Sequence, residues 1–293
     1  MKKRNVILTA FFLLAVIPFM VTAQKLPNVQ ETSLRAPADT KVDGKAIEWN
    51  NQFQAYNKAT EIFYTLSNDN DKLYLTVQAT DLDIINKIIC KGIALTINGT
   101  GKMKDQEGVT ITFPMLNENA FPRGQRGEAY KSIPINLDKP DSWPADTFMV
   151  VLNKNFVSVA KDIKVTGIKE ITGSLISIYN PYGIKAVALF DTKTIFTYEL
   201  AVPLKYLGLS VKNPKPFVYN IKLVSMNADW TEESGHGVST VASALRVQRQ
   251  QIRKNYFLSA TPDFHYYLGG PGAPRLYSLM GPTDFWGEYT LAK

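Results

Sequence analysis

Apolar and polar residues alternate along several short stretches of this chain, and this two-residue period restricts the fold more than any other feature of the sequence. The alternation is clearest in residues 73–79, 93–97 and 109–113. It is typical of β-strands with one buried face and one more polar face. Further strands are predicted at residues 62–66, 148–152, 156–160, 186–190, 195–202, 217–225 and 285–291.

Turn-forming residues separate these stretches. Residues 67–71 and 98–101 are predicted hairpin loops, because Asn and Asp tolerate the left-handed backbone and Gly adopts it freely. Helices are predicted only at residues 82–90 and 241–256, where apolar residues recur at helical spacing. Many strands, frequent turns and few helices favour an all-β fold, an antiparallel β-sandwich.

The second predicted helix is strongly basic. Arg246, Arg249 and Arg253 recur at i, i+3 and i+7, and residues 241–256 contain no acidic residue. We favour a solvated helix face as the explanation. The alternative is a basic contact surface for an anionic sugar or a lipid headgroup.

The first residues have the layout of a secretory signal peptide. Lys2, Lys3 and Arg4 precede an apolar run at residues 6–20, and small residues lead to a predicted cleavage after Ala23. The apolar run is short for a membrane anchor, so no transmembrane span is expected after cleavage. Removing the three positive charges of residues 1–23 lowers the formal net charge from +7 to +4. Export to the periplasm or the extracellular space, together with this modest charge, argues against a nucleic-acid partner.

The sequence offers little material for catalysis. It has none of the common hydrolase, metalloprotease, phosphate-loop or dithiol motifs, and it has one cysteine and two histidines. We therefore expect no enzyme activity and no cofactor. Asp69 and Asp71 could offer oxygen ligands to calcium, but they lack the spacing of an EF-hand loop, and a solvated hairpin turn is favoured.

Four stretches together resemble one family. They are residues 42–49, with the residues VDGKAIEW; 68–81, with LYLTVQATD at their end; 198–204, with YELAVPL; and 284–291, with DFWGEYTL. In this order they resemble the family 9 carbohydrate-binding modules and the DOMON-like superfamily, above all exported bacterial members of unassigned function. The resemblance implies a jelly-roll-like β-sandwich with a non-catalytic binding role.

The same resemblance implies one domain at residues 41–293. It would follow a flexible lead-in at residues 24–40 and contain insertions at residues 114–185 and 227–281.

The shared stretches also have a physical interpretation. Asp43 and Gly44 are expected to form a tight turn, with Ile47 and Trp49 following as apolar anchors. Glu199 falls on the opposite strand face from its apolar neighbours. It could pair with Arg or Lys, which we favour, or ligate a hard cation.

Loop aromatics are the candidate ligand contacts, because flat rings pack against the C–H faces of sugars. Trp143 and Trp230 stand in polar settings and are the first candidates, and Tyr179, Tyr182, Tyr266 and Tyr267 are weaker ones. The favoured function is an exported module that binds a glycan. An envelope scaffold or protein-interaction domain is the alternative, and a haem-binding DOMON-type domain is a third possibility.

Overall fold

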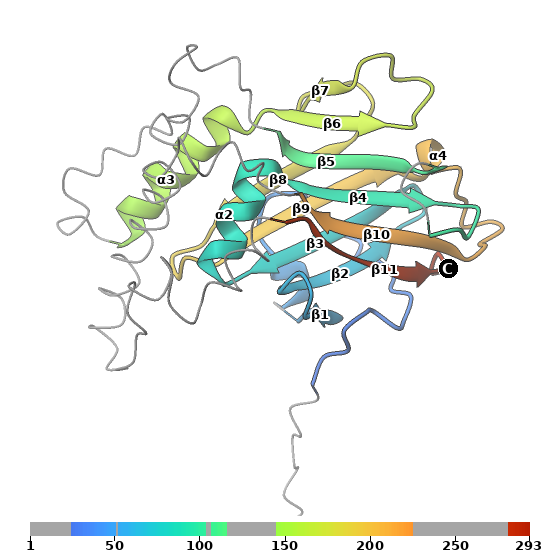
Figure 1. Cartoon of the computed structure of the whole chain (residues 1–293), viewed down its shortest axis with the longest axis horizontal. Coiled ribbons are helices and arrows are strands. Elements are labelled where there is room, and N and C mark those ends of the chain that lie inside the picture. Colours follow the sequence, from blue (N-terminus) through green and yellow to red (C-terminus); the bar gives the residue numbers. More distant parts are fainter. Residues whose placement is uncertain (1–24, 51, 104–106, 116–144, 225–280) are drawn as a thin grey trace, which may run out of the picture.

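The computed structural model describes residues 25–50, 52–103, 107–115, 145–224 and 281–293, and these form two antiparallel sheets packed face to face (Figure 1). The five-stranded sheet has the order β1 (Ala55–Asn57), β2 (Ile62–Asn68), β3 (Lys72–Ala79), β9 (Phe196–Pro203) and β8 (Lys185–Phe190). The six-stranded sheet has the order β11 (Thr283–Tyr289), β10 (Phe217–Leu223), β4 (Ile93–Asn98), β5 (Val109–Met115), β6 (Asp162–Thr166) and β7 (Leu175–Ser177). The predicted all-β antiparallel sandwich is confirmed.

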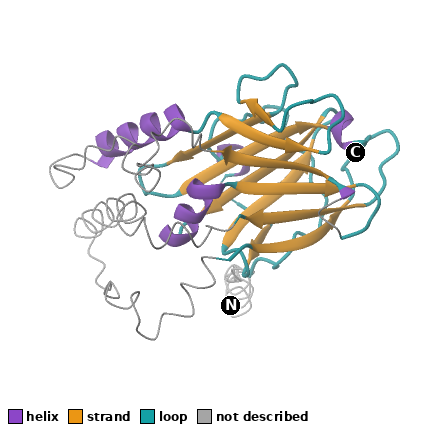
Figure 2. Cartoon of the chain, turned by 45° about the horizontal axis from the view of Figure 1, so that its top comes forward, coloured by secondary structure: helices purple, strands orange, loops and turns teal. Residues whose placement is uncertain are grey.

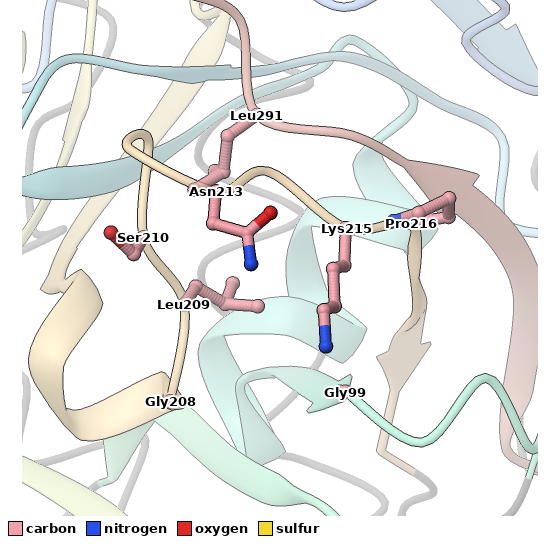
Figure 3. Close-up of a pocket in the computed structure, with 8 residues that line it drawn as sticks. All are labelled: Gly99, Gly208, Leu209, Ser210, Asn213, Lys215, Pro216 and Leu291. Carbon is pink, nitrogen blue, oxygen red and sulfur yellow. The ribbon is translucent and has the colours of Figure 1, made fainter.

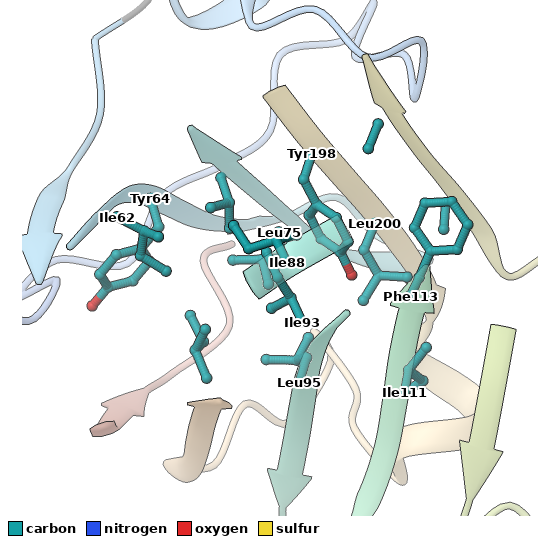
Figure 4. Close-up of a cluster of buried hydrophobic side chains, with 14 of the residues drawn as sticks. Ile62, Tyr64, Leu75, Ile88, Ile93, Leu95, Ile111, Phe113, Tyr198 and Leu200 are labelled. Atoms are coloured by element: carbon teal, nitrogen blue, oxygen red, sulfur yellow. The ribbon is translucent and has the colours of Figure 1, made fainter. Parts of the chain in front are cut away.

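The main core lies between the sheets, because the registers place apolar residues of neighbouring strands on the same inward face. Leu75 pairs with both Leu66 and Leu200, and Leu95 pairs with Ile111. All five side chains are buried, and Figure 4 shows Leu75, Leu95, Ile111 and Leu200 among them. Complete burial of such a side chain stabilises the fold by about 1.5–3 kcal/mol. The alternating pattern therefore identified the inward face correctly.

The predicted hairpins at residues 67–71 and 98–101 are confirmed, since β2 pairs with β3 and β4 pairs with β5. The helix predicted at residues 82–90 is also confirmed, as α2 (Leu82–Lys91). Lys87 of this helix is fully buried and donates hydrogen bonds to the Gly281 carbonyl (2.6 Å) and to Oγ1 of Thr283 (3.0 Å). It thereby ties α2 to the start of β11.

The strands predicted at residues 148–152 and 156–160 are wrong, because this segment forms helix α3 (Ala145–Val159). Met149, Leu152 and Phe156 are buried at helical spacing, and α3 packs on β8. The amide of Asn153 holds the helix there by bonding both the carbonyl and the N–H of Phe190, each at 2.8 Å. A short apolar run has no clear period of its own, so only the tertiary contacts decide between helix and strand.

The described part of the predicted lead-in lies against the sandwich, since residues 25–36 pack along the five-stranded sheet. Gln30 is buried, and its side-chain amide bonds both the carbonyl (2.8 Å) and the N–H (2.7 Å) of Leu66. Ala36 adds a backbone hydrogen bond to Asn68 (2.9 Å). The outer face of this sheet carries apolar side chains such as Tyr74 and Ala201, and the N-terminal segment covers them.

Trp49 anchors this outer layer as predicted, but Ile47 does not. Both lie in the short 3₁₀ helix η1 (Ile47–Trp49), where Trp49 is buried and Ile47 is 62% exposed. Three residues make one turn of such a helix, so positions two apart point in different directions.

The two ends of the sandwich differ. Helices α2 and α3 lie at one end, and the short helix α4 (Leu204–Leu207) lies at the other, near the C-terminus (Figures 1 and 2). The predicted helix at residues 241–256 lies outside the described residues. Within the described ranges, none of the helices is long and apolar enough to cross a bilayer.

Candidate ligand-binding surface

Most of the predicted contact residues lie outside the described residues. These are Trp143, Trp230, Tyr266, Tyr267 and the basic stripe Arg246, Arg249 and Arg253. Their roles stay predictions. The structure describes Tyr179, Asp69 and Asp71. Tyr179 is exposed to solvent, whereas the Asp69 side chain is hydrogen-bonded within its own hairpin.

Tyr179 is presented to solvent by a well-fixed loop. It follows strand β7, and its side chain is 78% exposed. Asn180 fixes the loop, because its side-chain N–H groups donate to the carbonyls of Ser177 and Ile184, each at 2.8 Å. The Asn180 side-chain oxygen accepts the N–H of Tyr182 (3.1 Å). An exposed aromatic ring on such a loop loses little backbone freedom when it binds a ligand.

Two more tyrosines meet beside this loop. The rings of Tyr182 and Tyr206, the second from helix α4, pack edge to face with centroids 6.3 Å apart. Both are partly buried against the core. Nζ of Lys205 lies 4.7 Å from the centre of the Tyr206 ring, which is cation–π distance. We call Tyr179, Tyr182 and Tyr206 the tyrosine surface.

A pocket of about 250 Å³ begins just beyond α4 (Figure 3). The loop between α4 and β10 supplies most of its wall, and the β4–β5 turn and the C-terminal segment complete it. The lining residues are Gly99, Gly208, Leu209, Ser210, Asn213, Lys215, Pro216 and Leu291. Gly208, which follows the last residue of α4, is two residues from Tyr206 in the sequence, so the pocket and the tyrosine surface adjoin along the chain. Together they offer apolar rings next to polar groups, the combination that ligand sites use.

The sequence analysis did not select Tyr206, Lys205 or the pocket. Their meeting with the β7–β8 loop depends on tertiary contacts that no local pattern reports. One signal was present, however. Residues 204–216 contain Lys205, Lys212 and Lys215 and no acidic residue.

In the hairpin loop at residues 67–71, the Asp69 carboxylate forms hydrogen bonds within the hairpin itself. Oδ1 of Asp69 accepts the backbone N–H groups of Asp71 and Lys72, each at 2.7 Å, and Oδ2 accepts the Tyr74 hydroxyl (2.6 Å). Partial burial acts to raise the pKa of Asp69, but the hydrogen bonds from Tyr74, Asp71 and Lys72 outweigh it, and the pKa is lowered. Asp69 therefore stabilises the turn, and no cluster of metal-ligating side chains occurs among the described residues.

Among the described residues Glu199 pairs with no Arg or Lys, and its partners are main-chain groups instead of the predicted ones. Its Oε2 accepts the backbone N–H groups of Asp43 and Gly44, each at 2.8 Å, and the side chain is only 3% exposed. Burial raises the pKa of Glu199 to about 7, and the nearby carboxylates of Glu48 and Asp43 add to this effect. Glu199 thus clamps the predicted tight turn, in which Gly44 has a φ of +81°.

The side chain of Leu189 leaves no room for a larger residue at this turn. A Cβ at position 44 would lie 2.7 Å from Cγ of Leu189. Because the Glu199 side chain accepts two main-chain N–H groups, we assign it a structural role.

Comparison of the chain with models of known protein families, with curated proteins and with solved structures finds no significant match.

Proposed function

We propose that this chain is an exported, non-catalytic module that binds a glycan through the tyrosine surface. The observation that carries the proposal is the 78% exposure of Tyr179 on a loop fixed by Asn180. An exposed aromatic ring costs free energy in water unless it packs against a partner. A sugar ring offers a C–H face for that packing and hydroxyl groups for the polar rim.

The composition of the rim supports this function. Lys205 borders the tyrosines, and the pocket beyond α4 adds Ser210 and Asn213. These are hydrogen-bonding side chains placed around apolar rings, and they suit a hydroxyl-rich ligand.

A contact between two of the shared sequence stretches supports the proposed relation to the family 9 carbohydrate-binding modules and their DOMON-like relatives. Glu199 comes from the YELAVPL stretch, and it accepts both N–H groups of the Asp43–Gly44 turn in the VDGKAIEW stretch. The two stretches thus form one structural unit, although 155 residues separate Gly44 from Glu199. The signal-peptide layout of residues 1–23 supports export.

Affinity electrophoresis against a panel of soluble plant, algal and microbial glycans tests the proposal. We expect at least one glycan to retard the protein, and we expect Tyr179→Ala to weaken that binding about tenfold, which corresponds to about 1.4 kcal/mol. Tyr182→Ala and Tyr206→Ala should also weaken it, although both rings contribute to packing.

Ile47→Ala is the matched control, because Ile47 is an exposed apolar side chain on the 3₁₀ helix η1, in the layer on the outer face of the five-stranded sheet. It should bind as the wild type does. The proposal fails if no glycan retards the protein, or if Tyr179→Ala and Ile47→Ala bind equally well.

A further inference from the structure

The pocket beside the tyrosine surface is lined by the ammonium group of Lys215, the amide of Asn213 and the hydroxyl of Ser210, and by no carboxylate. We infer that it binds the anionic group of an acidic glycan, a carboxylate or a sulfate, while the tyrosine surface packs against the sugar rings. This inference rests on the proposed function and narrows its ligand class.

Asn213 and Lys215 supply the main donors. In Figure 3 the Asn213 amide and the Lys215 ammonium extend from the same loop into the space above Leu209 and Gly99. Neither side chain has a hydrogen bond or an ion pair within the part of the chain that the structure describes. Ser210 accepts the N–H of Lys212 (3.3 Å) through its hydroxyl oxygen, so its own O–H stays available as a donor.

The pocket lining contains no carboxylate. A neutral sugar hydroxyl both donates and accepts hydrogen bonds, so a site for neutral sugars needs acceptor side chains as well as donors. An ionised carboxylate or a sulfate only accepts hydrogen bonds. The Asn213 amide and the Ser210 hydroxyl both donate and accept hydrogen bonds, so they suit either kind of group. The positive charge of Lys215, with no carboxylate in the lining to balance it, favours an anionic group.

The charge of the surrounding segment agrees with this choice. Residues 204–216 carry three lysines and no acidic residue. On the adjoining β4–β5 connection, by contrast, Lys102 has an acidic neighbour, Glu107, at 3.9 Å. Lys212 and Lys215 have no such neighbour in the described residues. Their unbalanced charge would raise the local concentration of an anionic ligand.

The size of the pocket limits what it can hold. A volume of about 250 Å³ is below the range of about 300–1,000 Å³ that is usual for small-molecule sites. It suits one charged group with part of its sugar ring, held against the apolar side chains of Leu209, Pro216 and Leu291. The rest of an oligosaccharide would extend over α4 toward the tyrosine surface.

Affinity electrophoresis with three probes tests the inference: polygalacturonate for carboxylates, chondroitin sulfate for sulfates, and an uncharged galactan. We expect one acidic probe to bind at least about tenfold more tightly than the galactan at low salt. That preference should fall severalfold at about 0.3 M salt, because salt screens exposed charges. The acidic probe that binds more tightly identifies the anionic group.

Single charge removals locate the site. Lys215→Gln and Lys212→Gln should each weaken binding of the acidic probe by about two- to fivefold, which is the range for exposed charges, and should leave any binding of the galactan unchanged. Lys193→Gln is the matched control, because Lys193 is an exposed lysine on the β8–β9 turn. It should behave as the wild type does.

The failures are distinguishable. Equal binding of acidic and uncharged probes, with continued dependence on Tyr179, would overturn the inference and leave the proposed function standing. The same holds if Lys215→Gln, Lys212→Gln and Lys193→Gln weaken acidic binding equally. Absence of binding to every probe and to the wider glycan panel would overturn both.

Discussion

The buried Glu199 carboxyl couples the stability of the sandwich to pH. Its pKa is raised from 4.5 to about 7 in the folded chain. Because the folded state holds this proton more tightly than the unfolded state, the contribution to stability is complete below about pH 4.5 and is lost as the pH rises to about 7. Each pH unit between the two values corresponds to about 1.4 kcal/mol, so the whole effect amounts to about 3 kcal/mol.

Glu199→Gln separates this effect from that of every other ionisable group. The N–H groups of Asp43 and Gly44 both donate to one oxygen of Glu199, Oε2. The single carbonyl oxygen of a glutamine can therefore accept both bonds, while the side chain no longer titrates. We expect the free energy of unfolding of the variant, relative to the wild type, to increase by about 3 kcal/mol between about pH 4 and about pH 8.

Urea unfolding, followed by circular dichroism at several pH values in this range, measures the difference. Glu288→Gln is the control, because Glu288 is an exposed carboxylate on β11, and a surface substitution of this kind should change the free energy of unfolding by no more than about 0.5 kcal/mol. Parallel stability curves for Glu199→Gln and the wild type across the whole range would refute the reasoning.

Two further predictions concern the hairpin loop and the corrected helix. Tyr74→Phe removes the hydroxyl that donates to Asp69 (2.6 Å), and it should lower the free energy of unfolding by about 1–2 kcal/mol at neutral pH. The pKa of Asp69 is lowered in the folded state, so the stabilisation from the Tyr74–Asp69 hydrogen bond is lost as the pH falls. In urea unfolding, the difference in free energy between Tyr74→Phe and the wild type should therefore shrink near pH 3. A difference that stays constant with pH would contradict this prediction. Phe156→Ala empties a buried site between α3 and the ring of Phe190, and it should lower the free energy of unfolding by about 3–5 kcal/mol. Val157→Ala, on the exposed side of α3, should lower it much less. Equal losses of stability in the two variants would argue against helix α3.

The sequence predicted the strands well where alternating apolar residues must lie on one buried face of the strand. Residues 73–79, for example, must place Leu73, Leu75 and Val77 on one face, and those side chains are buried. The same rule could not recognise α3, because the apolar run at residues 148–152 fits a helix or a strand, and its packing on β8 decides.

The candidate site was predictable only in part. Tyr179 was selected as a loop aromatic, and it is exposed. Tyr206 was missed, because its place beside Tyr182 arises where two distant segments meet. The role of Glu199 was misjudged for a related reason. Its partners are the backbone N–H groups of Asp43 and Gly44. Every residue except proline has such a group, so the sequence alone does not indicate which ones will be left to bond a side chain.

Amide hydrogen exchange with bound glycan tests the central claim most directly. The probe is the glycan that gives the strongest retardation in affinity electrophoresis, and the measurement compares peptides across the chain with and without it. We expect slower exchange in residues 177–184 and 204–216, around the tyrosine surface and the pocket, and no change in residues 47–61, which include η1 and the edge strand β1 of the five-stranded sheet. Slower exchange confined to segments away from the tyrosine surface would contradict the account.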